Sequence, residues 1–63
     1  MNNLEFYRKK AGLTQEELSK KTGILTSGIC RVEKGVSDFN GQRWKIIAEA
    51  LGCSVDELLG KAN

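Results

Sequence analysis

The sequence predicts an all-α fold, a compact domain of five short helices that takes up the whole chain of 63 residues. Three observations predict it. No stretch shows the sustained alternation of apolar and polar residues that marks a half-buried strand. Glycines stand at most of the joints between helical stretches, and the chain has no proline. Two segments, TQEEL and SVDEL, carry the Ser/Thr-x-x-Glu pattern that starts a helix.

The first predicted helix covers residues 3–11. Asn2 or Asn3 can cap its start, and Gly12 suits the left-handed residue that follows a helix. A helix of this length is too short to be stable alone in water, so it must pack against the others.

The next two helices are separated by about three residues. The second begins after Thr14, whose side chain forms a capping box with Glu17, and it ends before Gly23. The third covers residues 26–34 and is closed by Gly35. Such a short connection is typical of a helix-turn-helix, in which the two helices cross steeply.

The last two helices follow the same rules. Asn40 caps a fourth helix over residues 41–51, and Gly52 ends it. A capping box in residues 54–57 opens a short fifth helix. Helical spacing predicts one core, made of Leu4, Tyr7, Leu13, Leu18, Ile24, Ile29, Val32, Trp44, Ile47, Ala48, Leu51, Val55 and Leu58.

Charge is distributed unevenly along the chain. Residues 1–45 hold nine basic and five acidic residues, whereas residues 46–63 hold one basic and three acidic residues. A polyanion would therefore meet the first part of the chain, although a solvated surface explains the same charges. There is no histidine, and the two cysteines do not have the spacing of metal ligands. We expect no metal, no cofactor and no catalytic residue, and a cytoplasmic protein without a membrane span.

The segments LTQEELSKKTGI, ICRVEKG and WKIIAEALGCSVDELL resemble the Cro/phage-repressor (Xre-like) helix-turn-helix DNA-binding family. The resemblance covers about residues 4–59. It implies a lambda-repressor-like fold with the helix-turn-helix at about residues 14–34, and a third helix that lies in the major groove of DNA.

The resemblance also implies which residues meet DNA. Those expected to read bases are Gln15, Thr26, Ser27, Cys30 and Arg31. Those expected near phosphates are Thr14, Gly28, Lys34, Asn40, Gln42, Arg43 and Lys45. Alternatives stay open: Arg31 could bind a phosphate or pair with Asp38, Gln15 could be a plain surface residue, and Arg43 and Lys45 cannot share a helical face.

Two further expectations follow from the resemblance. The family often pairs an arginine of the first helix with a glutamate at the end of the third, which here are Arg8 and Glu33; we expect a structural ion pair. The usual serine or threonine cap of the third helix is replaced by Leu25, which cannot accept the capping hydrogen bond. Thr26 could then take over the cap and delay the helix by one residue.

The function that the resemblance implies is a transcriptional regulator, expected to be a repressor that acts as a homodimer on an inverted-repeat operator. Phe6, Phe39 and the C-terminal LLGKAN are the apolar features that could supply a dimer contact. The alternative is a protein-interaction module of the same fold, such as an antitoxin or accessory subunit. The VSDF segment after Gly35 favours that alternative, because this loop is often basic in the family and here has no basic residue and one acidic residue, Asp38.

Overall fold

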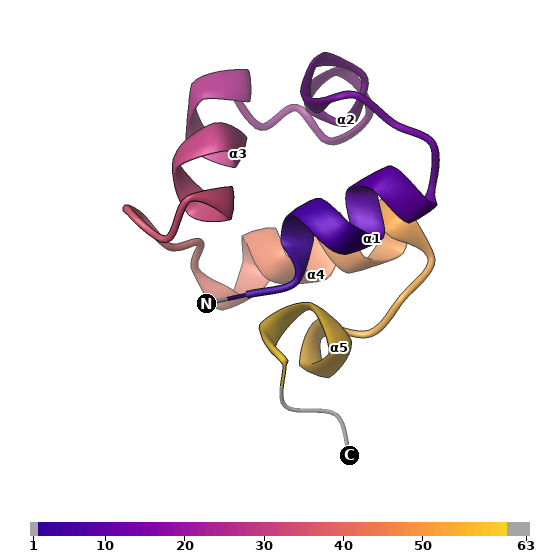
Figure 1. The fold of residues 1–63 in the computed structure, drawn as a ribbon, viewed down its shortest axis with the longest axis vertical. Helices are drawn as coiled ribbons and strands as arrows, with labels where there is room; N and C mark the ends of the chain where they lie inside the picture. The colour runs from indigo at the N-terminus through magenta and orange to yellow at the C-terminus, as the bar shows by residue number, and fades with distance from the viewer. Residues whose placement is uncertain (1, 61–63) are drawn as a thin grey trace.

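The computed structural model describes residues 2–60, which form five α-helices and contain no strand. The helices are α1 (Leu4–Lys10), α2 (Gln15–Thr22), α3 (Thr26–Glu33), α4 (Gly41–Leu51) and α5 (Val55–Leu59). The all-α prediction is confirmed, and each predicted helix is present. In Figure 1, α1 crosses in front of α4, α2 and α3 lie together at one end, and α5 lies at the other. Within the described residues, no helix is long and apolar enough to span a membrane.

The predicted caps explain where most of these helices begin. Thr14 and Glu17 form one capping box, and Ser54 and Glu57 form the other. Backbone hydrogen bonds at these two helix starts lower the pKa of both glutamates below the usual value. The side chain of Asn40 accepts a hydrogen bond from the backbone N–H of Arg43 at the start of α4. Local signals thus define three of the five helix starts.

The first asparagines link α1 to two other helices. Asn2 accepts a hydrogen bond from the N–H of Leu4, and its amide donates to the carbonyl of Val32 at 2.9 Å. Asn3 occupies the cap position without a side-chain cap, and its amide donates to the carbonyl of Glu57 at 3.0 Å. Both amides therefore fasten the start of α1 to α3 and α5.

The core lies where the five helices meet, and each of them contributes a buried side chain to it. Its buried apolar members are Leu4, Leu18, Ile24, Ile29, Val32, Phe39, Trp44, Ile47, Ala48 and Leu58. The predicted core residues Tyr7, Leu13, Leu51 and Val55 are half-buried and pack against it. Phe39 was expected as a surface contact for a dimer, and that expectation is wrong. Its ring packs edge-on against Trp44, with centroids 5.1 Å apart, and it is only 8% exposed.

Of the other expected dimer contacts, Phe6 lies at the surface, whereas Leu58 of the C-terminal LLGKAN is fully buried in the core, so that part of the expectation is also wrong. Phe6 is 60% exposed, and its ring meets Tyr7 edge-on. Residues 61–63 of the C-terminal LLGKAN lie outside the described residues.

The start of α3 differs from the expectation that Thr26 replaces the missing cap. Leu25 itself occupies the cap position with extended backbone angles, and no side chain accepts a hydrogen bond there. Thr26 is already the first helical residue, because the carbonyl of Leu25 accepts the N–H of Ile29 at 3.1 Å and so opens the helix. Against serine or threonine at this position, leucine costs about 0.5–2 kcal/mol of stability.

Candidate nucleic-acid interface

A hollow of about 350 Å³ lies beside α3. Its walls are the turn between α2 and α3, α3 itself, the segment between α3 and α4, and the start of α4. It is lined by Gly23, Ile24, Leu25, Ser27, Gly28, Arg31, Ser37, Phe39 and Arg43. The structure therefore brings together four of the residues expected to meet DNA: Ser27, Gly28, Arg31 and Arg43. They come from two helices whose relative position depends on the burial of Phe39 and Trp44.

Gly28 is not required by the fold itself. Its backbone angle lies outside the left-handed region that favours glycine. A Cβ atom added at this position would meet only Ile24 Cγ2, at 3.9 Å, which is an ordinary contact. Glycine inside a helix costs about 1 kcal/mol relative to alanine. Within the described chain, neither backbone conformation nor packing explains this cost, and the missing side chain leaves the exposed face of α3 open.

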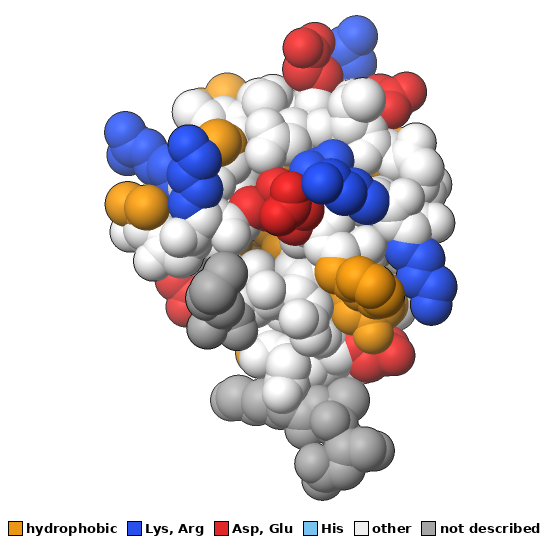
Figure 2. Space-filling view, viewed as in Figure 1, with side chains coloured by type: hydrophobic (Ala, Val, Ile, Leu, Met, Phe, Trp, Pro, Cys, Tyr) orange, Lys and Arg blue, Asp and Glu red, His pale blue; other side chains and the backbone are white. Residues whose placement is uncertain are grey.

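The charges around this hollow leave positive groups at the surface. Arg31, Lys34, Arg43 and Lys45 are all exposed. The two acidic residues of the same region, Glu33 and Asp38, are engaged by neighbouring protein groups. In Figure 2, Lys and Arg side chains gather on the flank that α3 forms in Figure 1. Within the described residues no salt bridge engages these cations. Arg8 balances the charge of Glu33, whereas Asp38 accepts hydrogen bonds from neutral N–H groups and keeps its negative charge.

Glu33 is the centre of a polar network between α1, α2 and α3. Arg8 Nε lies 2.6 Å from Glu33 Oε2, and Arg8 Nη2 donates to Oε1 at 3.2 Å. Arg8 Nη1 donates to the carbonyl of Leu13 at 2.8 Å. The hydrogen bond to Glu33 raises the pKa of Arg8 above its usual value. Because both side chains are under 10% exposed, this pair links the helices from within.

Gln15 belongs to the same network. Its Nε2 donates to Glu33 Oε1 at 2.9 Å, so one face of the amide is held by the protein. The side chain of Gln15 is thus half-buried and oriented by the protein, and its contact with DNA stays a prediction. The remaining N–H and the carbonyl oxygen of the amide are the groups that it can offer to a partner.

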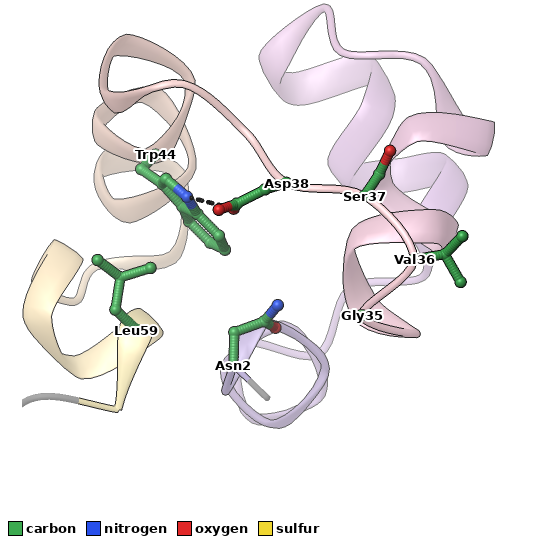
Figure 3. A pocket seen from close by; sticks show the side chains of 7 residues that line it. All are labelled: Asn2, Gly35, Val36, Ser37, Asp38, Trp44 and Leu59. Atoms are coloured by element: carbon green, nitrogen blue, oxygen red, sulfur yellow. Dashed lines mark hydrogen bonds between the residues drawn. The ribbon is translucent and has the colours of Figure 1, made fainter.

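Asp38 does not pair with Arg31, so that alternative is also wrong. Its Oδ1 accepts the backbone N–H of Phe39 at 2.8 Å and Trp44 Nε1 at 3.1 Å. Figure 3 shows the Asp38 carboxylate hydrogen-bonded to the Trp44 indole at the wall of a second hollow, which Ser37 also lines. Asp38 thus anchors the segment between α3 and α4 on the side opposite the α3 hollow, which Ser37 and Phe39 line.

We expect Asp38→Ala to lower the free energy of unfolding by about 1–2 kcal/mol, because two N–H groups lose their acceptor. Trp44 emission should shift as its indole loses this partner, which fluorescence of the folded variant measures. Asp38→Asn keeps an oxygen acceptor without the charge and serves as the control. Equal losses in the two variants would show that the charge, and not the hydrogen bonds, stabilises the segment.

The remaining expected DNA contacts are less concentrated. The side-chain oxygens of Thr14 and Asn40 are used as helix caps. Gln42 and Lys45 are exposed but do not line the hollow, so of the two basic residues of α4 only Arg43 lies beside α3. The other expected contacts outside the hollow are Thr26 and Cys30, both half-buried, and Lys34, which is exposed.

Sequence reasoning did not place five residues of the hollow at the site: Gly23, Ile24, Leu25, Ser37 and Phe39. Leu25 carried a signal, because a large apolar residue stood where a cap was expected. Phe39 carried none, because it lies between α3 and α4, where no helical spacing relates its ring to that of Trp44. Within residues 2–60 there is no group of three or more His, Cys, Asp or Glu that could hold a metal ion.

Comparisons with known proteins show the family of this chain. The model of the family described as helix-turn-helix matches residues 4–58. An uncharacterized HTH-type transcriptional regulator of Methanocaldococcus jannaschii is 35% identical over 57 residues, which cover 90% of this chain and 86% of that protein. No solved structure gives a significant match.

Proposed function

This chain belongs to the Xre/Cro-like helix-turn-helix family, and from that premise we propose that it is a sequence-specific, double-stranded DNA-binding transcription regulator. We propose further that it acts as a repressor on an inverted-repeat operator. The observation that carries the proposal is the hollow at the first turn of α3. There, two exposed arginines flank a helical face that has small side chains and an unexplained glycine.

The base-reading part of the proposal concerns the outer face of α3. With this helix in the major groove, Ser27 and Arg31 project toward base edges, and Gly28 allows the backbone to come close. The planar fork of Arg31 matches O6 and N7 of guanine. Thr26 and Cys30 border this set, and Gln15 reaches it from α2 with the free side of its amide.

The phosphate-binding part concerns the rim. Lys34 lies at the end of α3, where the DNA backbone would pass, and Arg43 lines the hollow from α4. The first turn of α4 adds the N–H groups of Gly41 and Gln42, because the Asn40 cap uses only the N–H of Arg43. Lys45 and Thr14 would add contacts at the margins. Such contacts position the protein on DNA without reading its sequence.

The size of the chain supports a homodimer on DNA. Half-sites read from one face of the duplex lie about 34 Å apart, one helical turn. The described chain measures 30 × 23 × 19 Å, so one copy covers one half-site. A two-fold pair would place one α3 in each of two successive major grooves. Phe6, which is exposed on α1, remains an apolar candidate for the contact between copies.

We expect Lys34→Ala to weaken binding to all DNA sequences alike and to reduce the salt dependence by about one unit of slope per monomer. The reason is that a protein with one phosphate contact fewer releases one counterion fewer from the DNA when it binds. Both effects are measured by binding isotherms at several salt concentrations. The two DNAs are the operator selected by this protein from a random library of duplexes, and random duplex DNA. Lys10→Ala removes the same charge from α1 and should leave the slope nearly unchanged. An unchanged slope in Lys34→Ala would remove Lys34 from the interface.

Retention of duplex DNA at increasing salt tests the proposed function as a whole. Steep salt dependence, together with tighter binding to a subset of sequences, is expected of a sequence-specific DNA-binding protein. Retention that is absent at low salt would instead favour the protein-interaction module. Repression is tested separately, by transcription from a promoter that carries the bound sequence.

A further inference from the structure

Leu25 stands at a helix cap, a position that favours polar residues, and the fold gains no stability from it. It stands at the cap of α3, where serine or threonine would stabilise the helix, and it makes no cap hydrogen bond. It also gains little from burial, because the residue is 74% exposed. Where a residue breaks a local preference and the fold gains nothing, a functional reason is the usual explanation.

The residues around Leu25 indicate what this functional reason is. Its side chain lines the α3 hollow together with Ile24 and Phe39, which form the apolar part of the wall. Gly28 follows one turn later and has no side chain, so the helical face beside Leu25 is open. The polar residues of the same wall include Ser27 and Arg31. The hollow therefore offers an apolar patch directly beside the groups proposed to read bases.

We propose that Leu25 is a specificity-determining residue that packs against the 5-methyl group of a thymine in each half-site; this inference rests on the proposed DNA-binding function. The edges of the bases in the major groove are otherwise made of hydrogen-bond donors and acceptors, and the thymine methyl is the apolar group they present. A leucine at the first turn of a helix in that groove meets the methyl group, whereas serine or threonine would cap the helix instead. The exposed side chain is then buried only when DNA is bound.

The methyl group itself can be removed to test this. Each thymine of the selected operator is replaced in turn by uracil, which keeps every hydrogen-bonding group and lacks only the methyl. With the wild-type protein, one replacement per half-site is expected to weaken binding about threefold to fivefold, the value of one buried methyl. With Leu25→Ala, the same replacement should have no effect, although binding to the thymine operator is weaker.

Two variants complete the design. Val36→Ala removes an equally exposed apolar side chain that does not line the hollow, and it should keep the wild-type response to uracil. Leu25→Ser restores the cap, so it should melt at a higher temperature than the wild type and yet bind the operator more weakly.

The possible outcomes distinguish the role of Leu25 from DNA binding itself. If wild type binds its operator but uracil weakens wild type and Leu25→Ala equally, the inference about Leu25 is overturned while DNA binding stands. If uracil has no effect on wild type at any position, Leu25 meets something other than a thymine methyl and the inference is again overturned. If wild type binds no DNA at low salt, the proposed function fails and the inference fails with it.

Discussion

Arg8→Ala is expected to lower the free energy of unfolding by about 3–5 kcal/mol, because it leaves the buried carboxylate of Glu33 without its positive partner. The carbonyl of Leu13 loses its donor as well. A domain of this length has a total stability of about 3–9 kcal/mol. The variant should therefore be mostly unfolded near room temperature or melt far below the wild type, as circular dichroism measures.

Lys9→Ala is the matched control on the same helix. Lys9 pairs with Glu5 at 3.1 Å, but both side chains are more than half exposed. Exposed pairs of this kind contribute about 0–1 kcal/mol, so this variant should melt close to the wild type. Equal melting temperatures for Arg8→Ala and Lys9→Ala would contradict the role given to the network around Glu33.

Arg31→Ala is expected to weaken binding to the preferred DNA by about 1–3 kcal/mol, which is about 5- to 150-fold, and to relax the preference at one position in each half-site. The reason is that Arg31 is exposed on the outer face of α3, and Asp38, the carboxylate suggested as its partner, is bonded to Trp44 instead. Its guanidinium is therefore available to a guanine. Affinities for the operator and for each single-base change measure the loss position by position.

Arg43→Ala gives the contrast for this experiment. Arg43 lines the same hollow from α4, but its proposed partner is a phosphate. It should weaken binding to every sequence by a similar factor. If Arg31→Ala behaves in the same way and keeps the wild-type preference, Arg31 is a phosphate anchor. Specificity would then come from Gln15, Thr26, Ser27 and the shape of the DNA.

The fold could be predicted from the sequence because its signals are local. A capping box needs only residues three apart, as in Thr14 and Glu17, and a glycine such as Gly23 ends a helix through its own left-handed backbone. The start of α3 was the exception. The fold tolerates Leu25 at the cap without a replacement bond, since the burial of Ile29 and Val32 stabilises this helix.

The site was predicted less completely because its geometry depends on contacts between distant residues. Helical spacing places Ser27 and Arg31 on one face, but it does not show that Gln15 is held by Glu33, 18 positions away. Phe39 stands among polar residues in the sequence, which indicated an exposed loop, although its ring packs against Trp44. Asp38 looked like a negative charge on a DNA-facing segment, and only its hydrogen bond to Trp44 Nε1 shows that it anchors this segment.

The most direct test of the central claim is selection of the bound sequences from a random library of duplex DNA. We expect an enriched inverted repeat whose half-sites are centred about one helical turn apart, 10–10.5 base pairs. Each half-site should contain a guanine whose replacement weakens binding of the wild type but leaves binding of Arg31→Ala unchanged. A library that emerges without enrichment, although the protein is folded and the salt concentration is low, would contradict sequence-specific DNA binding by this chain.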